Sequence, residues 1–99
     1  MSNKLVIYSK ENCSYCTKAK NFLNELNINY EEIKLNIGKE DDIIIIKNLK
    51  ETYNHNTFPF ILIKGESDVF IGGFNELQTA YNTMYIHKFV VINDQDCEF

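Results

Sequence analysis

The spacing of apolar residues changes twice in the first third of the chain. Residues 4–9 form a short run that is mostly apolar and rich in β-branched side chains, which predicts a buried strand. From Ser14 onward, apolar residues recur three and four positions apart, as one buried helix face requires: Ala19, Phe22, Leu23 and Leu26. Residues 27–29 end this helix, and the weak alternation over 30–35 predicts a second strand. The helical crossover between them makes the two strands parallel.

Residues 41–53 are ambiguous, because the four consecutive isoleucines at 43–46 favour a strand by propensity. We nevertheless predict a helix. Asp41 and Asp42 stand at its start and lysines stand toward its end, an order that complements the helix dipole. The face expected to be buried comprises Ile43, Ile46, Leu49 and Tyr53.

The second half of the chain predicts a hairpin followed by a helix. Segments 60–63 and 68–71 flank the turn 64–67, and Gly72 and Gly73 then end the second strand. Asn75 is the expected N-cap of the last helix. The residues expected to face inward from it are Leu77, Tyr81 and either Met84 or Tyr85.

The element order β-α-β-α-β-β-α predicts an α/β fold with a four-stranded mixed sheet flanked by three helices. We expect one domain over residues 1–92 and a flexible acidic tail over 93–99. A length of 99 residues with 44% hydrophobic content is enough for a core that needs no disulfide staples.

Charge and the N-terminal sequence exclude several classes of protein. The net charge is −4 and the lysines are dispersed, so nucleic acid is not an expected partner. The first apolar run has only four residues, too short for a signal peptide or a membrane span. We therefore expect a cytoplasmic monomer that does not bind membranes.

Two cysteines stand where the first strand passes into the first helix. Free N–H groups and the positive end of the helix dipole stabilise a thiolate at such a position, which is that of Cys13. Cys16 lies one turn into the helix and is expected to be more covered, which suits a resolving thiol. Lys10 adds a positive charge just upstream.

Other readings of the cysteines stay open. A Cys-x-x-Cys pair is also half of a zinc site, but His55, His87 and Cys97 offer no second pair at ligand spacing. Cys16 alone could be an ordinary buried small side chain. Cys97 is expected to be an unpaired surface thiol in the tail.

Three separated segments together resemble a glutaredoxin over about residues 4–88. They are Tyr8-Ser9-Lys10 before Cys13-Ser14-Tyr15-Cys16, then Thr57-Phe58-Pro59, then Gly72-Gly73-Phe74-Asn75-Glu76-Leu77. Thioredoxins are similar in fold, but their motif usually has Trp before the first Cys and Gly-Pro inside it. This chain has no Trp.

The resemblance implies a thioredoxin-like fold in which the peptide bond before Pro59 is cis. The backbone of Phe58 would then face the cysteines and pair with the cysteinyl part of glutathione. Thr57, Phe58 and Pro59 are therefore expected at the glutathione site. A trans proline that only begins an edge strand is the alternative.

The resemblance also assigns the two ends of glutathione. Gly73 would allow a close approach, and the N–H groups of Phe74 and Asn75 would hold the γ-glutamyl carboxylate. Glu76 stands where the family usually has Asp, which puts the contact to the α-amine in doubt. An ordinary turn is the alternative for the glycine pair.

At the other end, Lys10 would bind the glycyl carboxylate and Tyr15 would form one wall of the groove. Lys50 or Asn56 would add a contact there. Lys10 as a solvated surface lysine is the alternative.

The function implied is glutathione-dependent reduction of protein disulfides and glutathione mixed disulfides. Cys13 would attack as a thiolate, and glutathione or Cys16 would resolve the intermediate. One alternative is an iron–sulfur carrier with Cys13 and glutathione as cluster ligands, suggested by Ser14 where many glutaredoxins have Pro. Another is a redoxin that thioredoxin reductase, in place of glutathione, reduces.

Overall fold

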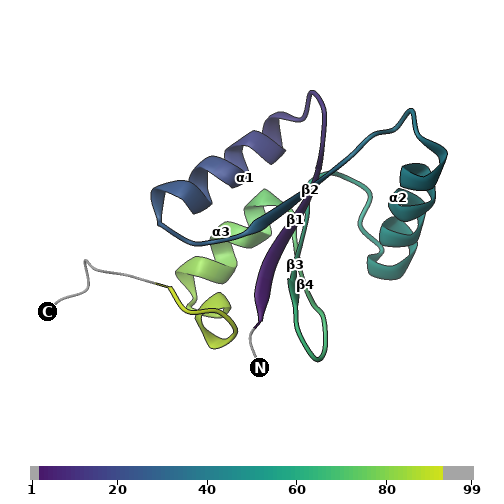
Figure 1. Ribbon diagram of the computed structural model, residues 1–99. Helices are drawn as coiled ribbons and strands as arrows, with labels where there is room; N and C mark the ends of the chain where they lie inside the picture. The colour runs from purple at the N-terminus through teal and green to yellow at the C-terminus, as the bar shows by residue number, and fades with distance from the viewer. Residues whose placement is uncertain (1–2, 93–99) are drawn as a thin grey trace, which may run out of the picture.

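The computed structural model describes residues 3–92, which form a mixed sheet with helices on both faces. Helices α1 and α3 cover one face of the sheet and α2 covers the other (Figure 1). The elements are β1 (Lys4–Lys10), α1 (Ser14–Glu25), β2 (Glu31–Leu35), α2 (Glu40–Tyr53), β3 (Phe60–Lys64), β4 (Val69–Gly72), α3 (Phe74–Asn82) and the 3₁₀ helix η1 (Ile86–Lys88).

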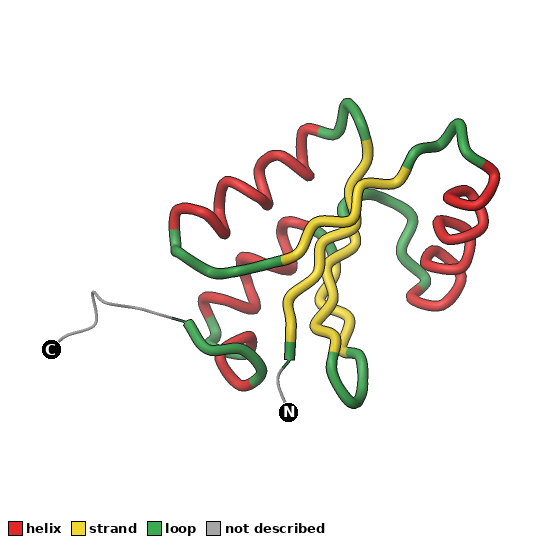
Figure 2. Tube along the Cα trace, viewed as in Figure 1, coloured by secondary structure: helices red, strands yellow, loops and turns green. Residues whose placement is uncertain are grey.

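The four strands lie in the order β2-β1-β3-β4. Strands β1 and β2 are parallel, whereas β1 with β3 and β3 with β4 are antiparallel. This arrangement confirms the predicted mixed sheet, with the parallel first pair and the closing hairpin (Figure 2). β1 and β3 are the central strands, and nearly every residue of β3 is buried.

Two hydrophobic clusters hold the layers together. The larger lies between the sheet, α1 and α3, with fully buried members that include Leu5, Ile7, Leu23, Ile61, Leu77 and Ile86. The smaller lies between the sheet and α2, with Leu35, Ile46, Leu49, Phe60 and Leu62. Burying one such side chain stabilises the fold by about 1.5–3 kcal/mol. Within residues 3–92, α2 is the one helix on its face of the sheet, whereas α1 and α3 share the other.

Helix α2 forms despite its run of isoleucines, as its charge pattern predicts. Acidic residues occupy the first turn and Lys50 lies in the last. Ile46 and Leu49 are buried as expected, but Ile43 is 47% exposed, so that part of the prediction is wrong. Contact of α2 with the core begins only at Ile46, and the first turn extends past the packed surface.

The N-cap predicted for α3 is wrong. The helix begins at Phe74, and Gly73 is the N-cap in place of Asn75. The N–H of Gly73 donates a hydrogen bond of 2.8 Å to a carboxylate oxygen of Glu76. The Glu76 side chain, from the first turn, therefore satisfies the backbone N–H of the N-cap residue, which is one half of a capping box.

The end of α3 also differs from the prediction. The helix stops at Asn82, and the positive φ of 66° at Met84 turns the chain away. Met84 and Tyr85 are exposed, and Ile86 from η1 fills the inward position instead. A single 3₁₀ turn has too few residues to leave a periodic signal.

Two predictions concern other parts of the chain. The acidic tail over 93–99, with Cys97, lies outside the described residues, and the domain boundary at residue 92 stays a prediction. Within residues 3–92, no helix combines the length and the apolar composition that crossing a bilayer requires.

Candidate active site

Cys13 is the N-cap of α1. β1 ends at Lys10, and a turn with a positive φ of 55° at Asn12 carries the chain into the helix, whose first residue is Ser14. The sulfur of Cys13 accepts a hydrogen bond of 3.2 Å from the backbone N–H of Cys16. A sulfur in this position receives a helix N–H and the positive end of the helix dipole, as predicted from the sequence.

The two cysteines are joined by a disulfide, with their Cα atoms 5.3 Å apart, within the usual range for such bonds. Cys13 is partly exposed, whereas Cys16 is 1% exposed. This difference agrees with the expectation that Cys16 is the more covered thiol. An incoming sulfur compound therefore reaches the sulfur of Cys13 first.

The peptide bond between Phe58 and Pro59 is cis, as the resemblance implied. Pro59 is buried, and the next residue, Phe60, pairs with Tyr8 of β1. Phe58 is half-buried, and its ring packs edge-on against Phe60 at 5.1 Å. The sheet thus holds this segment beside the end of β1, close to the strand that leads to Cys13.

Two adjoining hollows, which together we call the long groove, meet at Tyr15, Thr57 and Phe58. The first, of about 410 Å³, is also lined by Lys10, Cys13, Ser14, Ile37, Ile46, Lys50 and Asn56. The second, of about 310 Å³, is also lined by His55, Gly73, Phe74, Asn75 and Glu76. The long groove therefore connects the predicted site residues of three separate segments. Among the predicted residues, Cys16 and Pro59 do not line the long groove, and both are buried.

Aromatic rings form the walls of the long groove. Tyr15 is 51% exposed and its ring centre lies 6.3 Å from that of Phe74. The Lys10 ammonium lies 5.8 Å above the ring of Phe58, and the Lys18 ammonium lies 5.0 Å from the ring of Tyr15. These contacts place two cations beside flat apolar surfaces at the groove.

The second hollow ends at the N-terminus of α3. The first helical hydrogen bond of α3 is the 2.9 Å bond from the N–H of Leu77 to the carbonyl of Gly73. The N–H groups of Phe74 and Asn75 therefore have no acceptor within the helix, and both residues line the groove. Such a pair of N–H groups at a positive helix end can bind a carboxylate.

The two glycines before α3 have different roles. Gly72 has a φ of +127°, and a Cβ added there would lie 2.7 Å from the Cβ of Glu76. A Cβ on Gly73 would come no closer than 3.4 Å to any neighbour. The conformation thus demands glycine at Gly72, whereas Gly73 is the residue that lines the groove.

His55 is the residue that the sequence interpretation missed, since it was considered there only as a zinc ligand. It lines the long groove two positions before Thr57, and its ring packs edge-on against Phe60 and Phe70. Its Nε2 is buried and has no hydrogen-bond partner within residues 3–92. Its closeness to Thr57 in the sequence was the one available signal.

A second groove, which we call the lysine groove, adjoins the long groove at Lys10, Cys13 and Ser14 and measures about 480 Å³. Three lysines and one acidic residue line it, together with both cysteines: Lys10, Lys20, Lys34, Glu11, Asn12, Cys13, Ser14, Cys16 and Thr17. No three Cys, His, Asp or Glu side chains gather into a metal-binding group anywhere in residues 3–92.

The Glu32 carboxylate lies close to the lysine groove. It accepts a hydrogen bond of 2.6 Å from the Ser9 hydroxyl and an ion pair of 2.9 Å from Lys20. The Ser9 bond first, and Lys20 second, lower the pKa of Glu32 below its ordinary value. Glu32 is thus a charged partner for Lys20 at neutral pH.

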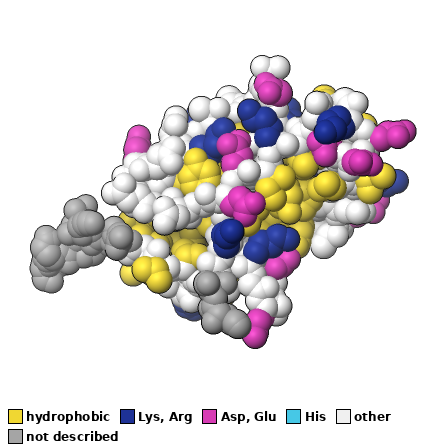
Figure 3. Space-filling view, in the orientation of Figure 1, with side chains coloured by type: hydrophobic (Ala, Val, Ile, Leu, Met, Phe, Trp, Pro, Cys, Tyr) yellow, Lys and Arg dark blue, Asp and Glu magenta, His cyan; other side chains and the backbone are white. Residues whose placement is uncertain are grey.

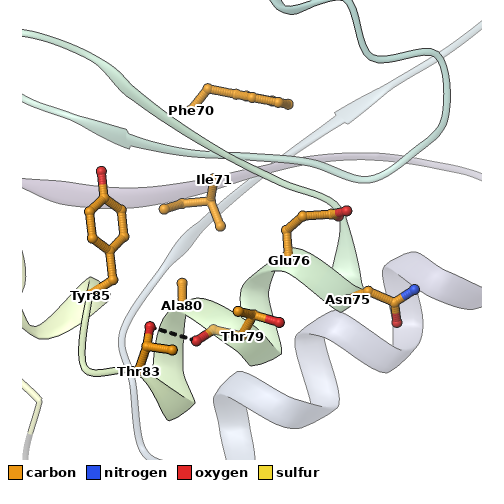
Figure 4. Close-up of a pocket in the computed structure, with 8 residues that line it drawn as sticks. All are labelled: Phe70, Ile71, Asn75, Glu76, Thr79, Ala80, Thr83 and Tyr85. Atoms are coloured by element: carbon orange, nitrogen blue, oxygen red, sulfur yellow. Dashed lines mark hydrogen bonds between the residues drawn. The ribbon is translucent and has the colours of Figure 1, made fainter.

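A separate hollow of about 390 Å³ lies between β4 and α3 (Figure 4). Asn75 and Glu76 are shared with the long groove, and the other lining residues are Phe70, Ile71, Thr79, Ala80, Thr83 and Tyr85. None of these is a cysteine, a histidine or a lysine. This hollow therefore contributes no redox group to the site.

Comparisons with known sequences agree on one family. A family model described as Glutaredoxin matches residues 5–67. The mitochondrial glutaredoxin-2 of Bos taurus is 36% identical over 90 residues, covering 88% of this chain and 49% of the bovine protein. Glutaredoxin-1 of Rhizophagus irregularis is 35% identical over 89 residues, covering 90% and 84%. The chain thus spans about half the length of the mammalian mitochondrial relatives.

Solved structures lead to the same fold. A buckwheat glutaredoxin in complex with glutathione matches with a TM-score of 0.73 and 27% identity, over 87% of this chain and 74% of that one. Oxidised glutaredoxin 2 from Chlamydomonas reinhardtii matches with a TM-score of 0.67 and 30% identity, over 87% and 78%. The fold is thioredoxin-like, and because the matched sequence runs from β1 through the cysteine motif to β3, this chain belongs to the glutaredoxin family.

Proposed function

We propose that this protein is a glutathione-dependent thiol-disulfide oxidoreductase that reduces glutathione mixed disulfides and protein disulfides. One observation carries the proposal: the sulfur of Cys13 caps α1 and opens into the long groove. The structural similarity to a glutaredoxin solved with glutathione supports glutathione as the ligand of that groove.

Glutathione fits the long groove in one direction. Its glycyl carboxylate would meet Lys10, with Lys50 and Asn56 on the same hollow. Its γ-glutamyl carboxylate would meet the N–H groups of Phe74 and Asn75, where the helix end favours an anion. A cation at one end and a helix N-terminus at the other thus match the two carboxylates of the tripeptide.

The middle of the tripeptide would lie between Tyr15 and Phe58, with Thr57 beside it and Gly73 leaving room for its backbone. This pose places the cysteinyl sulfur near Cys13. Glu76 already accepts the Gly73 N–H with one oxygen, so the α-amine of glutathione would have to use the other. With Glu in place of the usual Asp, this contact to the α-amine stays a prediction.

The first chemical step is a substitution at sulfur. The Cys13 thiolate attacks the glutathione sulfur of a protein–glutathione disulfide. A new bond forms between the two sulfurs, the old disulfide bond breaks, and the protein leaves as a thiolate that takes a proton from water. A second glutathione thiolate then attacks the glutathione bound to Cys13. Glutathione disulfide leaves, and the Cys13 thiolate is regenerated.

A protein disulfide requires Cys16 as well. Cys13 first forms a mixed disulfide with one sulfur of the target, and Cys16 then attacks Cys13 and releases the target as a dithiol. The product is the Cys13–Cys16 disulfide present in the structure. Two glutathione molecules restore the two thiols, with glutathione disulfide as the oxidised product.

The decisive experiment is a coupled assay with two electron sources. We expect turnover of a cysteine–glutathione mixed disulfide with glutathione, glutathione reductase and NADPH, and loss of that turnover in Cys13→Ser. Turnover with thioredoxin reductase and indifference to glutathione would instead identify a redoxin. No turnover with either source would contradict the proposed activity.

The alternative function, an iron–sulfur carrier, rests on Ser14. Ser14 is exposed and is the first residue of α1. The resemblance leads us to expect Pro at this position in many glutaredoxins. In such a carrier, Cys13 and glutathione would be the ligands of the cluster. Anaerobic reconstitution with iron, sulfide and glutathione would then give visible cluster absorbance and a glutathione-dependent dimer with little turnover. A colourless monomer would exclude it.

The proposed cycle needs a compartment that contains reduced glutathione. The cytoplasmic location and the monomeric state, both expected from the sequence, stay predictions.

A further inference from the structure

An isoleucine side chain stands exposed beside the reactive cysteine. Ile37 is 66% exposed, yet it lines the same hollow as Cys13. Its turn is well fixed: the N–H of Asn36 donates to the Asp42 carboxylate and the N–H of Gly38 donates to the Asn36 side chain, both at 2.8 Å. The exposure of Ile37 is therefore a property of an ordered turn.

A second isoleucine extends this apolar surface. Ile43 is 47% exposed and lies one turn before Ile46 on the same face of α2, and Ile46 lines the hollow with Cys13. We call Ile37 and Ile43 the isoleucine patch. Hydrophobic side chains also gather between the sheet and α2 on the face drawn in Figure 3. Apolar surface that continues from a reactive site is typical of a binding surface.

The charges around Cys13 have the opposite sign to the protein as a whole. The hollow beside Cys13 holds Lys10 and Lys50 and no acidic side chain. The lysine groove adds Lys20 and Lys34, with Glu11 as its one acidic lining residue. The net charge of the chain is −4, so these lysines make a local positive region on an acidic protein.

Two of these lysines are available to a ligand. Lys20 is paired with Glu32 at 2.9 Å, and Lys34 is loosely paired with Glu11 at 3.8 Å between exposed groups. Among the residues that the structure describes, no carboxylate lies within ion-pair distance of Lys10 or Lys50. Lys10 would take the glycyl carboxylate of glutathione, so Lys50 and the loosely paired Lys34 remain for an anionic group of a polypeptide.

We propose that the isoleucine patch and the lysines around Cys13 are the docking surface for the polypeptide part of the substrate. The segment it fits carries an apolar side chain next to the glutathionylated cysteine and acidic residues beyond it. This inference rests on the proposed function, in which glutathione would span the long groove from Lys10 to Phe74. The polypeptide must then lie over the remaining rim, which these apolar and cationic residues form.

The chemistry is the transfer described above. The Cys13 thiolate takes the glutathionyl group, the disulfide of the substrate breaks, and the peptide leaves as a thiolate. The docking surface changes how well the peptide is held during this step. It therefore alters kcat/KM for peptides more than for a small disulfide.

The test compares four glutathionylated substrates with the wild-type protein. They are a peptide with leucine beside the modified cysteine and glutamates beyond, the same peptide with serine for leucine, the same peptide with lysines for glutamates, and the cysteine–glutathione disulfide. We expect kcat/KM to fall about five- to tenfold for each altered peptide relative to the first.

Variants locate the effect on the surface. We expect Ile37→Ser to lower the ratio of kcat/KM for the first peptide to kcat/KM for the cysteine–glutathione disulfide about fivefold, and to abolish the preference for leucine. The matched control is Ile44→Ser. Ile44 is 59% exposed on α2, the helix that follows the Ile37 turn, and lines none of the grooves described here, so the ratio should not change.

The two proposals fail in different ways. If the wild-type protein does not turn over the cysteine–glutathione disulfide, the proposed function itself is wrong. If that turnover is normal but all three peptides react equally and Ile37→Ser leaves the ratio unchanged, only the docking surface is wrong. A dimer that loses stability specifically in Ile37→Ser would also overturn it, because a second copy of the chain would then be the occupant.

Discussion

The backbone N–H of Cys16 points at the sulfur of Cys13 across 3.2 Å. This contact puts the reactive sulfur where a Ser, Thr or Asp side chain would normally cap a helix. In the reduced protein the same N–H would face a thiolate, a stronger acceptor than a neutral sulfur. The contact also distinguishes the two cysteines. Cys16 donates the N–H to the Cys13 sulfur, and the side chain of Cys16 is itself buried.

Replacing Cys16 should separate the two classes of substrate. In Cys16→Ser the Cys13 thiolate and the long groove remain, so we expect turnover of glutathione mixed disulfides to stay within about threefold of wild type. Reduction of a protein disulfide, which needs the second thiol, should fall at least about tenfold. Steady-state kinetics with both substrates measures this. Equal losses on both would mean that Cys16 acts only through the structure.

Removing the positive charge of Lys10 should weaken the binding of glutathione. We expect Lys10→Gln to raise KM for glutathione about three- to tenfold with a smaller change in kcat, because the charge contacts a group remote from the reacting sulfurs. The matched control is Lys47→Gln, an exposed lysine of α2 that lines none of the grooves described here. A KM that is equal in both variants would show that Lys10 is only a solvated lysine.

The two glycines before α3 should differ in their effect on stability. Gly72→Ala combines a φ of +127° with a 2.7 Å approach to Glu76, so we expect it to lower the free energy of unfolding by about 1–3 kcal/mol. Gly73→Ala has an ordinary φ of −99° and should change it by less than about 1 kcal/mol. Urea unfolding of both variants provides the comparison. Equal destabilisation would contradict the separate roles assigned to them.

Glu32 should make stability depend on pH in one direction. Its pKa is lowered from 4.5, mainly by the hydrogen bond from Ser9 and then by Lys20. A carboxyl with a lowered folded pKa stabilises the protein above its unfolded pKa, and that contribution disappears as the pH falls through the folded value. Solvent screens this exposed carboxylate, so Glu32→Gln should cost less than about 1 kcal/mol at pH 7, and the difference from wild type should shrink below pH 4.5. A difference that is constant with pH would refute this.

Much of the fold follows from sequence because its signals are local. The spacing of Ala19 and Leu23 gives one buried helix face, and the charge order of α2 outweighs the strand propensity of its isoleucines. Two of the errors have different causes. Ile43 has the right helical phase, but tertiary packing leaves it 47% exposed. The N-cap error is local: Glu76, three residues on, accepts the Gly73 N–H, and Gly73 therefore replaces Asn75 as N-cap.

The parts of the site that could be predicted are those whose reactivity depends on where a residue stands in a helix or strand. Cys13 at a helix start needs no tertiary information, and the resemblance placed Thr57 and Phe58 beside it. His55 and Ile37 were not predictable in this way. Each comes to the long groove through tertiary packing, and neither residue type signals a thiol-disulfide site by itself.

The most direct test of the account is the pKa of the Cys13 thiol in the reduced protein. Alkylation by iodoacetamide, followed from pH 3 to 10 in a Cys16→Ser, Cys97→Ser background, measures it. We predict a pKa at least one unit below the ordinary value of about 8.5, because the α1 N-terminus stabilises the thiolate. A Cys13 thiol that titrates at or above about 8.5 would contradict the central claim, since the helix would then not stabilise the thiolate and at most a few per cent of the thiol would be ionised at neutral pH.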